Sequence, residues 1–84
     1  MTDEEQIIIC AVRYALGRMS YITGIVAEYV ASKKDELSEQ CKAIIILDIE
    51  TEYALYRSMG QTLGMECDER TWLRLLEVLK NERN

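Results

Sequence analysis

The segment from Ile7 to Ala31 is apolar along most of its length, but Arg13 and Arg18 interrupt it near the middle. A stretch of this length raises the question of a membrane span. Charged side chains near the centre of a spanning helix carry a large free-energy cost, so these arginines, together with Glu28, argue against a membrane span. In a globular domain each arginine then needs solvent, an internal counter-ion or a ligand.

The chain of 84 residues has the length of one domain, which we expect to span residues 1–84. A domain this small usually gains stability from disulfides, a metal ion or a partner chain. It has no His, and its three cysteines lie far apart without a C-x-x-C pair, so neither a disulfide framework nor a zinc site is indicated. Association with a partner chain is the remaining source of stability.

The charge of the chain limits its partners and its location. The net charge is −5, from 15 acidic and 10 basic side chains, whereas a nucleic-acid-binding surface needs a net basic patch. We therefore expect no nucleic-acid partner. The first six residues are acidic and do not resemble a signal peptide, so we expect a cytoplasmic protein.

The first half of the chain predicts two helices. Thr2 and Glu5 form a capping-box pattern, so a helix should start at about Asp3. Gly17 favours the position after a helix and Ser20 the position before one, which predicts a break or kink between them. The apolar residues at helical spacing before this break are Ile8, Val12, Ala15, Leu16 and Met19. Those after it are Ile22, Ile25, Val26, Tyr29 and Val30.

The second half predicts a long helix from about Asp35 to about Met59, with Ser32 or Asp35 as its N-cap. Two glycines then predict a helix end and a turn. Asp68 is predicted to cap a last helix that places Trp72 in the core, and the tail from residue 81 to residue 84 is expected to fray. The fold class is therefore all-α, a compact bundle of three to four helices with short connections.

Two isoleucine-rich runs predict a homodimer. Ile7–Ile9 and Ile44–Leu47 point in all directions around a helix, and a helix that is apolar all round is buried on more than one side. A chain of 84 residues has few internal neighbours to cover both sides. A second copy of the chain is the natural cover, and it would complete the bundle.

Asp48 is predicted to lie in the middle of the inner face of the long helix. That face is defined by Leu37, Cys41, Ile44, Ile45, Leu55 and Met59. An unpaired buried carboxylate costs several kcal/mol. We therefore expect Asp48 to pair with Arg13 or Arg18, with Glu52, one turn later, as the counter-ion available to the other arginine.

The remaining arginine supports a second interpretation. If Glu52 does not pair with it, a surplus positive charge lies beside two tyrosines, and Arg with Tyr can hold an anion or an aromatic ring. The candidate ligand-binding or partner-binding residues are Arg13, Tyr14, Arg18 and Tyr21. Internal ion pairing and tight helix packing explain the same residues without a ligand.

The sequence does not indicate an enzyme. It lacks His, a glycine-rich phosphate loop and a nucleophile with recognisable activating partners. Asp48 and Glu52 with a third carboxylate such as Glu28 could hold a divalent ion, but two carboxylates at this spacing are a weak signal. We expect no cofactor and no metal.

Three segments, "VRYALGRMSYI", "ILDIE" and "MECDERTWLRLL", resemble small uncharacterised proteins of prophages and mobile elements in bacteria, mostly Gram-positive ones. The resemblance covers most of the chain. The matching positions are Arg13 to Arg18, Ser20 with Tyr21, Asp48, Asp68 and Trp72. It implies a phage-type accessory protein and no particular activity.

These observations favour a non-enzymatic protein that binds a host or phage protein, for example to block a defence system. The first alternative is a protein that binds a small anion or nucleotide through the Arg/Tyr cluster. The second is a purely structural or assembly module. A metal-dependent hydrolase is the least favoured hypothesis.

Overall fold

The computed structural model of the chain describes residues 1–18 and 20–81. Its elements are α1 (Asp3–Ala15), α2 (Ser20–Ser32), the short 3-10 helix η1 (Lys34–Glu36), α3 (Glu39–Ser58) and α4 (Glu66–Asn81). The predicted all-α bundle of three to four helices is confirmed. Asn81, the first residue of the tail predicted to fray, is the last residue of α4. Met19, predicted on an apolar helix face, and residues 82–84 of that tail lie outside the described residues.

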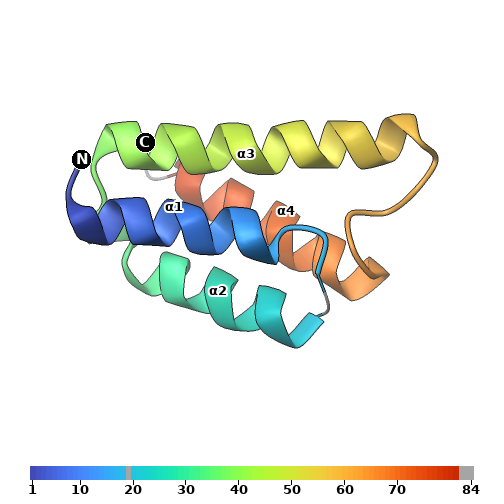
Figure 1. Cartoon of the computed structure of the whole chain (residues 1–84), viewed down its shortest axis with the longest axis horizontal. Helices are drawn as coiled ribbons and strands as arrows, with labels where there is room; N and C mark the ends of the chain where they lie inside the picture. The colour runs from blue at the N-terminus through green and yellow to red at the C-terminus, as the bar shows by residue number, and fades with distance from the viewer. Residues whose placement is uncertain (19, 82–84) are drawn as a thin grey trace.

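The four helices enclose one hydrophobic core. α1 and α3 run in one direction and α2 and α4 in the other (Figure 1). α1 packs on α2 and α3, and α4 packs on the same two helices. The buried apolar side chains are Ile8, Ile9, Val12, Ala15, Leu16, Ala27, Val30, Leu37, Cys41, Ile45, Ile49, Leu63, Trp72, Leu75 and Leu79. Within the described residues, no helix has the length and hydropathy needed to cross a membrane.

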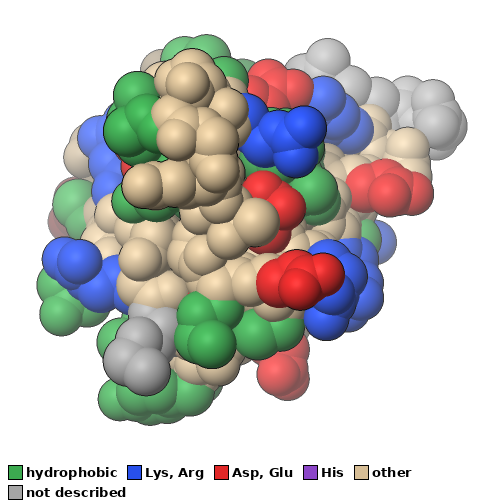
Figure 2. Space-filling model, turned by 90° about the vertical axis from the view of Figure 1, so that its right-hand side faces the viewer, with side chains coloured by type: hydrophobic (Ala, Val, Ile, Leu, Met, Phe, Trp, Pro, Cys, Tyr) green, Lys and Arg blue, Asp and Glu red, His purple; other side chains and the backbone are tan. Residues whose placement is uncertain are grey.

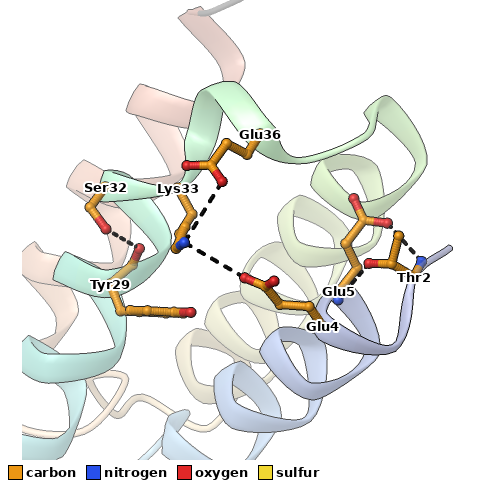
Figure 3. Close-up of polar contacts among 7 residues, drawn as sticks. All are labelled: Thr2, Glu4, Glu5, Tyr29, Ser32, Lys33 and Glu36. Atoms are coloured by element: carbon orange, nitrogen blue, oxygen red, sulfur yellow. Dashed lines mark hydrogen bonds and ion pairs between the residues drawn. The ribbon is translucent and has the colours of Figure 1, made fainter.

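A single carboxylate connects the starts of two helices. Glu5 and Thr2 form the predicted capping box, in which each side chain accepts a hydrogen bond from the other residue's backbone N–H at 3.1 Å (Figure 3). The second Glu5 oxygen accepts from the backbone N–H of Ser38 at 2.7 Å. Ser38 is the N-cap of α3, so Glu5 holds the start of α3 beside the start of α1.

The predicted start of the long helix was wrong. α3 begins at Glu39, because the hydroxyl of Ser38 accepts a hydrogen bond from the backbone N–H of Cys41 at 3.1 Å and caps the helix there. Asp35 lies in η1, and the Ser32 hydroxyl donates to the Tyr29 carbonyl instead of capping. The polar stretch thus contains a complete 3-10 turn before the helix.

The predicted break after the first helix is confirmed. α1 ends at Ala15, Leu16 is its C-cap, and Gly17 follows with a φ of +81°. Such a left-handed conformation costs glycine little, which is why glycine is common at this position. A Cβ on Gly17 would lie 2.8 Å from the Tyr56 hydroxyl oxygen, so α3 also packs tightly against this turn.

The role predicted for Asp68 was also wrong. α4 begins at Glu66, and Asp68 lies in its first turn, where Oδ2 accepts a hydrogen bond from the backbone N–H of Met65 at 3.0 Å. The carboxylate still satisfies a free N–H at the helix start, but from inside the helix. The predicted turn between α3 and α4 is present, and Trp72 is fully buried as expected.

The predicted inner face of the long helix was partly wrong. Cys41 and Ile45 are fully buried, but Leu55 and Met59 are 50% and 53% exposed. Ile49, next to Asp48, takes the buried position. α3 is therefore rotated relative to the prediction, and its central carboxylate lies at the edge of the core.

The rotation of α3 can be tested with two substitutions of similar chemistry. Ile45→Ala removes a fully buried side chain and should lower the free energy of unfolding by about 2–5 kcal/mol. Leu47→Ala, at a position 61% exposed, should change it by about 0.5 kcal/mol or less. Urea denaturation followed by circular dichroism measures both, and equal losses would contradict the orientation of α3.

The Glu5 connection predicts a pH dependence. The hydrogen bonds from Ser38 and then Thr2 lower the pKa of the Glu5 carboxyl below its ordinary value of 4.5. A lowered folded-state pKa means that this stabilisation is complete above the unfolded pKa and is lost as pH falls through the folded one. The thermal midpoint of the native chain should therefore fall more steeply below pH 4.5 than that of Glu5→Gln. Glu77→Gln, on exposed helix surface, should follow the native curve, and parallel curves for all three would contradict the role of Glu5.

Candidate functional site

Arg13 forms an ion pair with Asp48 between α1 and α3. Its Nε lies 2.7 Å from Asp48 Oδ2, and its Nη2 lies 3.4 Å from Oδ1, so the guanidinium meets the carboxylate with two hydrogen bonds. The contact raises the pKa of Arg13, first through the hydrogen bond and then through the opposite charge. A contact between Asp48 and one of the two arginines was predicted from the sequence, and it is present.

The pair is less buried than predicted. The Arg13 side chain is 59% exposed, and that of Asp48 is 18% exposed. Glu52, predicted as the second counter-ion, is half-buried. Together with Arg13 and Asp48 it lines a hollow of about 300 Å³. No ion pair of Glu52 is found among the described residues. Arg13 therefore joins two helices at the surface, where solvent stabilises either charge that loses its partner.

The exposure of Arg13 predicts a small energetic coupling to Asp48. Exposed ion pairs contribute little because water screens both charges. In a double-mutant cycle with Arg13→Ala and Asp48→Ala, the coupling should be small and should fall as the salt concentration rises. Urea denaturation at low and high salt measures it. A loss in Asp48→Ala as large as that in Ile45→Ala would mean that the pair is buried after all.

Arg18 lies in a different environment from Arg13. Its guanidinium carbon is 4.5 Å from the centre of the Tyr14 ring, a cation–π distance, and both side chains are exposed. Tyr21 is 71% exposed on α2. The structure thus joins Arg18 with Tyr14 but directs Arg13 toward α3, so the four predicted residues do not line one pocket. Within the described residues Arg18 has no ion-pair partner.

A largely apolar surface covers the outer sides of α1 and α2. We name it the α1–α2 face, and its members are Ile7, Ala11, Tyr14, Tyr21, Ile25 and Tyr29. Its five large side chains are 46–71% exposed. A groove of about 240 Å³ runs between the two helices beneath it. Hydrophobic side chains also gather along the lower edge of Figure 2, where α2 lies in Figure 1.

Charged groups lie at both ends of the α1–α2 face. At the start of α1, Lys33 lies 3.7 Å from a carboxylate oxygen of Glu4 and 3.7 Å from one of Glu36 (Figure 3). The same ammonium lies 5.8 Å from the centre of the Tyr29 ring. Its pKa is raised, chiefly by Glu36. At the other end Arg18 lies over Tyr14, so one end carries excess negative charge and the other a positive charge.

Ile25 and Tyr29 were predicted on the apolar face of the second helix, whereas the structure exposes them at 61% and 46%. The small residues of α2 explain the difference. Gly24, Ala27 and Ala31 line a hollow toward α4, so α2 meets α4 partly through small residues, and Tyr21, Ile25 and Tyr29 stay on the outer side. Their spacing of three and four residues is the signal that could have revealed the exposed face.

The carboxylates considered for a metal site lie on different parts of the bundle. Asp48 and Glu52 line the hollow beside α1 and α3, whereas Glu28 lines the one between α2 and α4. In the described part of the chain, no three His, Cys, Asp or Glu side chains are grouped so that they could hold a metal ion.

Comparison with known proteins found no matching family model, curated protein or solved structure. The resemblance to prophage proteins stays a prediction.

Proposed function

We propose that this chain is a non-enzymatic protein of phage or prophage type that binds other proteins. The observation that carries the proposal is the α1–α2 face, where five large apolar side chains lie in solvent beside a groove. A contiguous apolar surface of this kind is characteristic of a protein–protein contact. Tyr side chains supply a large contact area with little loss of conformational entropy, and Tyr is enriched at such contacts.

The proposal includes self-association and a cytoplasmic setting. Of the two isoleucine-rich runs that predicted a homodimer, each leaves one large side chain strongly exposed, Ile7 at 68% and Leu47 at 61%. The remaining members are buried or half-buried in the bundle. The acidic net charge supports a protein partner rather than a nucleic acid. A host or phage protein is the class of partner that the sequence resemblance suggests.

One observation favours the alternative of a small anionic ligand. Arg18 lines a broad, open hollow of about 840 Å³ together with Tyr56 and Gln61. An arginine without an internal counter-ion beside such donors could attract a phosphate group. The ligand would then contact Arg18 alone of the two arginines, since Arg13 is paired with Asp48. A purely structural module would need neither the α1–α2 face nor the hollow beside Arg18.

Native mass spectrometry of the chain purified from its own host distinguishes these functions. We expect a stoichiometric complex, with a second copy of the chain or with another protein, that is lost in Ile25→Asp and kept in Leu55→Asp, a substitution at a similarly exposed position of α3. A retained small anion, lost in Arg18→Ala, would instead support the ligand-binding alternative. A chain with neither a bound protein nor a bound anion, and no self-association, would contradict the proposal.

A further inference from the structure

The α1–α2 face carries symmetrically spaced apolar side chains along α2 and opposite charges at its two ends. On α2, Tyr21 and Tyr29 lie four residues to either side of Ile25. On α1, Glu4 lies seven residues before the small residue Ala11, and Arg18, which follows the turn after the helix, lies over Tyr14 at the opposite end. The two helices run antiparallel (Figure 1). The lining of the groove also brings Ala11 and Ile25 together.

We propose that this face binds a second copy of the same face, around a two-fold axis that passes between Ala11 and Ile25. The inference rests on the homodimer of the proposed function and names its surface and its symmetry. A two-fold contact uses the same patch on both subunits, so the patch must be complementary to itself after the rotation. This rotation places Tyr21 of one copy at Tyr29 of the other, and Glu4 of one copy at Arg18 of the other.

The charges favour this arrangement over one in which the two copies lie parallel. The Lys33 ammonium is shared between the carboxylates of Glu4 and Glu36, so this cluster of three groups carries one net negative charge. Arg18 holds a charge that no described carboxylate neutralises, and its cation–π contact with Tyr14 leaves N–H groups at the edge of the guanidinium. The two-fold rotation brings these opposite charges together twice, whereas a parallel alignment would bring like charges together.

The size of the face suits a dimer. Its five large side chains each expose on the order of 100 Å². A standard-size interface buries about 800 Å² from each partner, which these side chains and the charged ends together approach. Ala11 at the centre lets the two copies of α1 approach closely, and the flanking aromatic and isoleucine side chains surround that contact.

Sedimentation equilibrium at micromolar concentration, combined with a charge exchange, tests the arrangement. The native chain should be a dimer, Ile25→Asp a monomer and Leu47→Asp, at an equally exposed position of α3, a dimer. Arg18→Glu and Glu4→Arg should each raise the dimer dissociation constant about tenfold or more, and the double variant should recover most of the affinity. Glu36→Arg, which also removes a Lys33 contact, serves as the control for the loss of the Glu4 ion pair, and circular dichroism melts confirm that each variant folds.

The outcomes separate this inference from the proposed function. A native chain that is monomeric would overturn both the homodimer and its surface. A dimer that survives Ile25→Asp but not Leu47→Asp would leave the homodimer standing and place it on α3. A third outcome would overturn the two-fold arrangement alone. In it, Ile25→Asp abolishes the dimer, but the double charge variant has a dimer dissociation constant no lower than those of the single variants.

Discussion

The Glu5 carboxylate is the contact on which the arrangement of the helices depends. One of its oxygens accepts from the backbone at the start of α1, and the other accepts from the N-cap of α3. Both bonds use N–H groups that a helix start leaves without an internal partner. The two helices must therefore begin side by side and run in the same direction. The Arg13–Asp48 ion pair joins them again farther along, so α3 is fixed at two points against α1.

This orientation of α3 decides which side chains remain in solvent. Once Ile45 and Ile49 face the core, Leu47 must point away from it, and Asp48 lies at the boundary beside Arg13. On α2 the small residues face α4, which leaves Ile25 and the tyrosines outside. Hydrophobic residues make up 49% of the chain, and a domain of 84 residues has too little interior for all of them. Among the described residues, five of the exposed large side chains lie on the α1–α2 face, whereas others, such as Leu47 and Leu55, are exposed on α3.

Local signals in the sequence predicted the helices, the capping box of Thr2 and Glu5 and the break at Gly17. Each of these depends on residues within one or two turns of each other. Ser38 was missed as the N-cap because Ser32 and Asp35 offered equally good local caps. The hydrogen bond from the Ser38 backbone N–H to the Glu5 carboxylate joins residues 33 positions apart in the sequence, so no local pattern reveals it. The orientation of α3 was missed because its apolar residues surround the helix, so periodicity alone did not single out a face. Contacts with α1 and α4 decided it.

The two arginines of "RYALGR" separate for a geometric reason. Arg13 is a residue of α1 on the side that faces α3, and its guanidinium group donates two hydrogen bonds to the Asp48 carboxylate. Arg18 follows the left-handed turn at Gly17, which redirects the chain toward α2 and carries this side chain back over Tyr14. Five residues of regular helix would have placed the two guanidinium groups about 140° apart around one axis. The glycine turn instead leaves Arg13 in the contact between α1 and α3 and places Arg18 at the edge of the α1–α2 face. In that position Arg18 does not stabilise the helix pair, and its charge becomes available to whatever protein or anion meets the α1–α2 face.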